Sequence, residues 1–249
     1  VTDGFNKENT AFYRGFEHFK PYDVKQGLAL NTILSSCSDQ VGGIWLGTQA
    51  GGASYYNGNI FKSFSTLNGL SNESVNCVYE DKHSNIWFGT DGGGVTKFDG
   101  ISFQTINSKL GLVSDWVRDI AEDRHGDVWF ATDDAGICIL KKDRIKDNYL
   151  FSKLNLENGL SSNKTRSLGQ DAFGNMWIGT LENGVSKYDG KSFSNYNTTN
   201  GLCGNKIRCI LSDSQHNLWI GTEGNGISMI DSASIRTGNI HFLTINQTT

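Results

Sequence analysis

Residues 85–94, which read Asn-Ile-Trp-Phe-Gly-Thr-Asp-Gly-Gly-Gly, decide the fold, because close copies of this stretch occur four more times in the chain. In every copy a Thr follows the Trp by three residues, and a Gly follows that Thr by four. The tryptophans of the five copies are 42, 42, 48 and 42 residues apart and stand at Trp45, Trp87, Trp129, Trp177 and Trp219. This period is typical of four-stranded propeller blades, whereas common helical repeats have periods of about 33 to 34 residues. The sequence therefore predicts a series of β-blades.

The composition supports an all-β class and one propeller domain. The 249 residues include 30 glycines and one proline, and the chain is rich in β-branched and aromatic residues, which favours many short strands joined by glycine turns. A net charge of -4 gives no electrostatic reason to expect binding to nucleic acid or to an anionic membrane surface. No apolar run reaches 18 residues, so we expect no membrane insertion of this segment.

The pattern inside one repeat predicts the four strands of a blade. In the second repeat we expect strands at residues 74–79, 86–90, 95–98 and 103–106, with a tight Asp-Gly turn between the last two. The residues on both sides of each Trp are also apolar, so both faces of the blade should be covered. We therefore expect blades stacked face to face, with the five tryptophans largely buried on equivalent second strands.

Five repeats begin at residues 27, 69, 111, 159 and 201, and each opens with Gly-Leu. Residues 1–26 resemble strands three and four of a partial blade, at 11–13 and 19–22. Residues 141–148 and 232–239 read as lengthened turns between strands three and four, the second one leading to a final strand near 240–245. Too few residues follow to supply the missing strands one and two. We therefore expect five blades and a half that form part of a larger ring, whose unpaired edges favour association.

Other candidate chemistry in the sequence is better explained by structure. An Asp precedes each Trp by six residues, in a turn where a carboxylate commonly accepts backbone N–H groups; because it recurs in every repeat, a catalytic role is disfavoured. The five cysteines form no Cys-x-x-Cys pair and fit small buried strand residues. The five histidines form no ligand-spaced pair. We therefore expect no catalytic residues, no metal site and no cofactor.

The repeat unit Gly-Leu-x-x-Asn-x-Val/Ile-x-x-Ile/Leu-x-x-Asp-x-x-Gly-x-Ile-Trp-Ile-Gly-Thr is nearly complete at 159–180 and 201–222. It resembles the two-component regulator propeller repeat, and the resemblance covers residues 27–246. The resemblance implies the extracytoplasmic sensing region of a bacterial hybrid histidine kinase, often built from paired seven-bladed propellers that respond to glycans. It thus implies a periplasmic or extracellular location, an oligosaccharide ligand, and further blades or a second propeller of the same polypeptide as partners.

Two other classes of function remain open. Related propellers also serve as surface proteins with a structural or protein-docking role. A lyase or quinoprotein-type propeller enzyme is less favoured, because no blade carries an out-of-pattern His/Glu pair suited to acid–base chemistry.

A ligand site is predicted where the fifth, sixth and eighth positions of repeats three to five gather near the central channel. Trp116 is the one tryptophan outside the repeat slot, so blade packing does not account for it. An indole beside Arg and Asn side chains suits a sugar ring, and Arg can hold an acidic group bidentately. The candidate residues are Trp116, Arg118, Asn163, Lys164, Arg166, Asn205, Lys206 and Arg208. In the alternative interpretation, these cations simply pair with carboxylates of the same face, at Asp91, Asp133, Asp134, Glu182 and Glu223.

Overall fold

The computed structural model describes residues 21–141 and 149–245, which form five antiparallel sheets of four strands, each paired in chain order. We call the sheets blades one to five. Blade one holds β1 (Ile33–Ser38), β2 (Ile44–Thr48), β3 (Ala53–Tyr56) and β4 (Phe61–Phe64). Blade two holds β5 (Val75–Glu80), β6 (Ile86–Thr90), β7 (Val95–Phe98) and β8 (Phe103–Ile106). Blade three holds β9 (Val117–Glu122), β10 (Val128–Thr132), β11 (Ile137–Leu140) and β12 (Phe151–Leu154). Blade four holds β13 (Thr165–Gln170), β14 (Met176–Thr180), β15 (Val185–Tyr188) and β16 (Phe193–Tyr196). Blade five holds β17 (Ile207–Ser212), β18 (Leu218–Thr222), β19 (Ile227–Ile230) and β20 (Leu243–Ile245).

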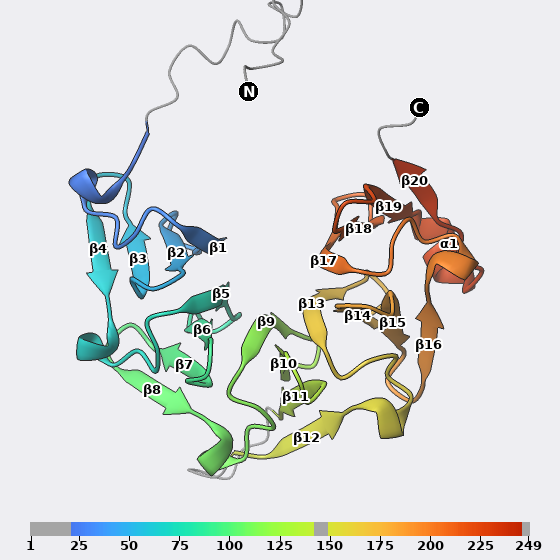
Figure 1. Ribbon diagram of the computed structural model, residues 1–249, viewed down its shortest axis with the longest axis horizontal. Helices are drawn as coiled ribbons and strands as arrows, with labels where there is room; N and C mark the ends of the chain where they lie inside the picture. Colours follow the sequence, from blue (N-terminus) through green and yellow to red (C-terminus); the bar gives the residue numbers. More distant parts are fainter. Residues whose placement is uncertain (1–20, 142–148, 246–249) are drawn as a thin grey trace, which may run out of the picture.

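The blades follow one another around a centre and make a β-propeller arc (Figure 1). The first strands β1, β5, β9, β13 and β17 lie innermost, and the arc is open between blade one and blade five (Figure 1). The predicted all-β propeller of five complete blades is therefore confirmed.

The predicted strands of blade two agree with the structure for β6, β7 and β8, and β5 differs by one residue at each end. The connection at 232–239 between strands three and four is lengthened, as predicted, but it contains the short helix α1 (Ser232–Thr237), which was not predicted. Asp231 caps its first turn by accepting from the Ser234 N–H, and Ile235 anchors it in the core. The last strand is correspondingly shorter than predicted. The expected strand at 11–13, residues 19–20 of the expected strand at 19–22, and most of the turn at 141–148 lie outside the described residues. Residues 21–22, which are described, are not in a strand.

A short 3-10 helix leads into each blade, and the glycine of the Gly-Leu pair ends it. These helices span Val24–Gln26, Thr66–Asn68, Ser108–Leu110, Leu156–Asn158 and Thr198–Asn200. The glycine after each of them adopts the left-handed conformation, with φ between 97° and 114°, which a residue with a Cβ rarely adopts. The repeated Gly-Leu thus marks a helix end, with the Leu buried in the core.

The repeat tryptophans pack across the boundary to the following blade. Trp45 contacts Phe88 of blade two, and Trp87 contacts Phe130 of blade three, with ring centroids 5.5 and 5.8 Å apart. Burying roughly 200 Å² of indole is worth on the order of 5 kcal/mol per blade as an upper bound. Trp45, Trp87, Trp129 and Trp177 are at most 5% exposed, as predicted, whereas Trp219 is only half-buried because no further blade covers it among the described residues.

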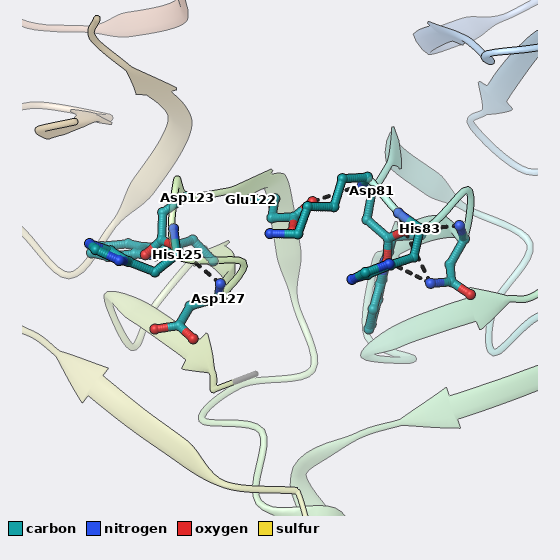
Figure 2. Close-up of polar contacts among 10 residues, drawn as sticks. Asp81, His83, Glu122, Asp123, His125 and Asp127 are labelled. Atoms are coloured by element: carbon teal, nitrogen blue, oxygen red, sulfur yellow. Dashed lines mark hydrogen bonds and ion pairs between the residues drawn. The ribbon is translucent and has the colours of Figure 1, made fainter. Parts of the chain in front are cut away.

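A carboxylate in the turn between strands one and two fixes each indole. The Trp Nε1–H donates to Oδ2 of the Asp six residues earlier, at 3.3 Å in blade one and 2.8 to 2.9 Å in the other four blades. The same carboxylate accepts from backbone N–H groups of its own turn, as Figure 2 shows for Asp81 with His83, and for Asp123 with His125 and Asp127. In blade five, hydrogen bonds to the Asp213 carboxylate lower its pKa to about 2, and the bond from the Trp219 indole N–H contributes most to this shift. The recurrent Asp is therefore structural, as predicted, and its bond to the Trp is an addition to the prediction.

Candidate functional site

The candidate residues lie on the face of the arc where each chain segment enters strand one and leaves strand two. Since the strands of a blade alternate in direction, these two kinds of loop share one face, and the strand one–two and three–four turns share the opposite face. We call the first of these the entry face. On this face four of the predicted cations, Arg118, Lys164, Arg166 and Arg208, form ion pairs with carboxylates.

Trp116 provides an exposed aromatic surface on the entry face. It lies immediately before β9, is 48% exposed, and pairs through its backbone with Asp91 of the preceding blade. Its indole runs beside Gly92, where an added Cβ would lie 3.5 Å from the indole Nε1. The corresponding loop positions in blades three and four carry Asp134 and Glu182. The indole therefore lies close to the backbone of blade two at Gly92.

Two arginines and two aspartates form a chain of charges next to this indole. Nη2 of Arg118 lies 3.3 Å from Asp91 Oδ1 and 3.0 Å from Asp133 Oδ2, and Nη2 of Arg166 lies 3.3 Å from Asp133 Oδ1. Asp133 therefore joins the inner strands of blades three and four. The hydrogen bond from Arg118 is the main cause that lowers the pKa of Asp133. Partial burial lowers the pKa of Arg166, which the neighbouring Arg118 and Arg208 lower further.

The other predicted cations are more exposed. Arg208 pairs with Glu223 at 3.0 Å and Lys164 pairs with Glu182 at 3.4 Å, and all four side chains are about half exposed. Lys206 is exposed. Pairing with entry-face carboxylates therefore occurs for Arg118, Lys164, Arg166 and Arg208, as the alternative interpretation expects. The Nε atoms of Arg118 and Arg166 are buried and find no hydrogen-bond partner among the described residues.

Asn163 and Asn205 have a local structural role that sequence reasoning missed. Oδ1 of Asn163 accepts from the Leu156 N–H at 3.0 Å, and Oδ1 of Asn205 accepts from the Thr198 N–H at 2.9 Å. Each side chain thereby binds the start of the 3-10 helix that precedes its own blade. Asp115 does the same for Ser108 in blade three. The signal was the recurrence of Asn, Asp or Glu at the fifth repeat position in all five repeats.

One carboxylate near the channel has an unusual environment. Asp119 on β9 stands in the slot that holds a small Ser or Cys in the other blades, and it accepts from the backbone N–H of Leu168 at 2.7 Å. Burial raises its pKa to about 6, and the two backbone hydrogen bonds it accepts only partly oppose this. Across residues 21–141 and 149–245 no group of three His, Cys, Asp or Glu side chains is placed to hold a metal ion. No described helix has the length and apolarity to cross a membrane.

Comparison with known proteins places the repeat in a family. The model of the two-component regulator propeller family matches residues 69–92, 111–134, 159–182 and 201–224, which hold strands one and two of blades two to five. No curated protein matches the sequence. Blade one carries the same strands and the same Asp–Trp turn, although its segment lies outside the matched residues.

Solved structures with the same fold include extracellular domains of two-component systems and a lyase. The extracellular domain of a proposed hybrid two-component system from B. thetaiotaomicron is 27% identical with a TM-score of 0.74, over 87% of this chain and 28% of that chain. A second such domain from the same organism is 20% identical with a TM-score of 0.71, over 88% and 32% of the two chains. A virginiamycin B lyase from Staphylococcus aureus is 16% identical with a TM-score of 0.64, over 87% and 71%. At these lower identities the second domain and the lyase show the fold alone.

The chain thus spans about a third or less of the two extracellular domains. The resemblance stated from the motifs is nevertheless confirmed, since the fold and the matched segments agree: blades two to five are built from two-component regulator propeller repeats.

Proposed function

We propose that this chain is a ligand-sensing propeller segment of a bacterial signal-transduction receptor, on the periplasmic or extracellular side of the envelope, and that it binds an oligosaccharide on its entry face. The observation that carries the ligand proposal is the half-exposed Trp116 indole beside the chain of Asp91, Arg118, Asp133 and Arg166. Aromatic rings pack against the C–H face of a sugar, while carboxylate and guanidinium groups bind its hydroxyls. The family match and the extracellular domain of the hybrid two-component system that is 27% identical support the sensor role and the location.

The ion pairs refine which glycans fit the site. Arg118 and Arg166 are already balanced by Asp91 and Asp133, so the chain of charges offers both donors and acceptors to a neutral sugar. An acidic sugar would have to displace a carboxylate from a cation. Among the three arginines, Arg208 has the exposed pair, with Glu223, so it can exchange partners at low cost. The site therefore accommodates a neutral ring beside Trp116 and an acidic substituent toward blade five.

Calorimetry with neutral and acidic oligosaccharides tests this proposal. For a glycan that binds the unaltered protein, Trp116→Ala should weaken binding about ten-fold, because the stacking surface is removed. Replacing Arg166 and Arg208 by Ala should weaken acidic glycans more than neutral ones. Ile101→Ala and Lys191→Ala are the matched controls, since both residues are exposed in turns of the opposite face. Unchanged affinity in all the entry-face variants would remove this site, and silence across the whole panel would favour the protein-docking alternative.

In the described part of the chain, the outer faces of blade one and blade five are uncovered at the two ends of the arc. They support the proposal that further blades, or a second propeller of the same polypeptide, are partners of this chain. Ile33 and Ile44 of blade one are 38% and 41% exposed, whereas Val75 and Ile86, their counterparts in blade two, are at most 4% exposed. On blade five, Leu211 is 56% exposed beside the half-buried Trp219. These apolar faces are the surfaces that neighbouring blades cover elsewhere in the arc. A longer polypeptide should therefore protect Trp219 from fluorescence quenchers, and equal quenching in both forms would contradict the proposal.

A further inference from the structure

A cavity of about 330 Å³ lies between blades one and two on the face opposite the entry face. Its apolar walls are Trp45, Tyr55, Phe64, Ile86 and Phe98. Its rim comes from the strand one–two turns of both blades, through Val41 and Ser84, and from the strand three–four turn of blade two, through Gly100. The volume falls at the lower end of the range for small-molecule sites, which is about 300 to 1,000 Å³.

The repeat explains why the cavity has aromatic walls at this boundary. In blades two and four, strand three carries Lys97 and Lys187, whose Nζ atoms lie over the repeat indoles at 5.5 and 5.8 Å from the ring centroid. In blade one the equivalent residue is Tyr55, whose ring centroid is 4.7 Å from that of Trp45. Burial, and then the nearby Asp39 carboxylate, raise the pKa of the Tyr55 phenol, which therefore stays neutral. Blade one thus has an aromatic ring at the position where blades two and four have an ammonium group.

The lysine of blade one stands instead on strand four, at the cavity. Lys62 is paired across the strands with Tyr55, and its Nζ lies 4.9 Å from the Phe64 ring centroid. It lines the cavity, and it forms no ion pair with any residue in the described part of the chain. The cavity therefore presents an ammonium group that forms no salt bridge within the described residues.

A carboxylate without a cationic partner lines the same cavity. Glu80 accepts the Gln40 backbone N–H at 2.9 Å but forms no ion pair within residues 21–141 and 149–245. At the next blade boundary the equivalent Glu122 accepts the Lys82 backbone N–H at 2.9 Å and also pairs with Lys82 Nζ at 2.8 Å. Gln40 occupies the position of Lys82 in blade one and brings no charge. The unpaired Glu80 is thus specific to this boundary.

The third charged group at the cavity is already engaged. Asp39 accepts from the N–H groups of Val41 and Gly43 and from Trp45 Nε1. The groups left for a ligand are therefore one ammonium, one carboxylate and an aromatic wall.

We propose that this cavity binds a free amino acid with an aromatic or large apolar side chain. Its carboxylate pairs with Lys62, its ammonium group pairs with Glu80, and its side chain lies against Trp45, Phe64 and Phe98. This site is independent of the glycan site, because it lies on the opposite face and at another blade boundary.

Calorimetry with three probes that differ in charge tests the proposal. Phenylalanine should bind the intact protein, whereas 3-phenylpropanoate, which lacks the ammonium group, and phenethylamine, which lacks the carboxylate, should each bind about ten-fold more weakly or less. If either analogue binds as tightly as phenylalanine, the assignment of the corresponding charge is wrong. If phenylalanine, leucine and tryptophan all fail to bind the folded protein, the proposal is overturned.

Variants that copy the neighbouring boundary sharpen the test. Gln40→Lys gives Glu80 the partner that Glu122 has in Lys82, so it should reduce phenylalanine affinity about ten-fold without removing any wall of the cavity. Lys62→Gln should reduce it similarly. Glu122→Gln, at the next boundary, is the matched control and should leave binding unchanged. Thermal unfolding confirms that each variant is folded, and unchanged affinity in both Gln40→Lys and Lys62→Gln would overturn the proposal.

Discussion

Replacing Asp171 by Ala should destabilise the protein far more than a typical turn mutation. Asp171 is 4% exposed and accepts from Trp177 Nε1 at 2.9 Å, from the backbone N–H groups of Phe173 and Asn175, and from the Asn175 side chain. Trp177 is 0% exposed, so its N–H finds no water when the acceptor is removed. A buried unsatisfied donor costs about 1 to 3 kcal/mol, and each lost bond to a charged acceptor costs about 1.5 to 3 kcal/mol. Because water can bind some of the backbone N–H groups that Asp171 leaves unpaired, we expect the free energy of unfolding to fall by about 3 to 5 kcal/mol in total.

A double-mutant cycle isolates the contribution of the indole bond. Trp177→Phe removes the donor and keeps an aromatic ring, so the double variant should lose about 1.5 to 3 kcal/mol less than the sum of the single losses. The measurement is urea unfolding followed by far-ultraviolet circular dichroism. Asp213→Ala with Trp219→Phe is the matched control in blade five, where the indole is half-buried and water can replace the carboxylate. A coupling below about 0.5 kcal/mol in blade four would refute the reasoning.

Three further outcomes follow from the packing and the charges. Trp177→Ala should cost about 3 to 5 kcal/mol in urea unfolding, and Trp219→Ala clearly less, because one face of its indole is uncovered; equal losses would contradict the open arc. The pKa of Asp119 is raised to about 6 in the folded protein, above its unfolded value, so the free energy of unfolding should fall by about 1 to 3 kcal/mol as pH rises from about 4 to about 6. Asp119→Ser should flatten this pH dependence. An unchanged pH profile in the variant would show that Asp119 is not its source. Gly94→Ala and Gly58→Ala each place a methyl group at a residue with positive φ. Only the methyl group at position 94 would also overlap a backbone oxygen of β8, so Gly94→Ala should lower the melting temperature more than Gly58→Ala.

The sequence predicted the repeated parts of the fold because one pattern was observed five times. The apolar residues beside Trp87 located β6, and the Asp-Gly turn at 99–100 located β7 and β8. The helix α1 was missed because it occurs once, in a segment where the repeat offers no comparison. The lower burial of Trp219 was also missed, since it depends on a missing neighbour and not on the residue itself.

The candidate site was harder to predict than the blades. Repeat position alone located Trp116, Arg118 and Arg166 on one face, and the structure confirms that they lie there. Position does not show which side chains serve the backbone, so Asn163 and Asn205 resembled ligand donors although they bind the 3-10 helices. Whether these residues hold a glycan stays a prediction.

The turn of blade one has a consequence for anyone who recombines or averages the repeats. Blades two, four and five place Asn85, Asn175 and Asn217 two residues before the Trp, so a consensus sequence would assign Asn to position 43. At this position a Cβ would overlap the Tyr55 phenol, which occupies that space. Gly43 and Tyr55 are therefore coupled, and a design procedure that treats alignment columns as independent would force the Tyr55 ring out of its place against Trp45.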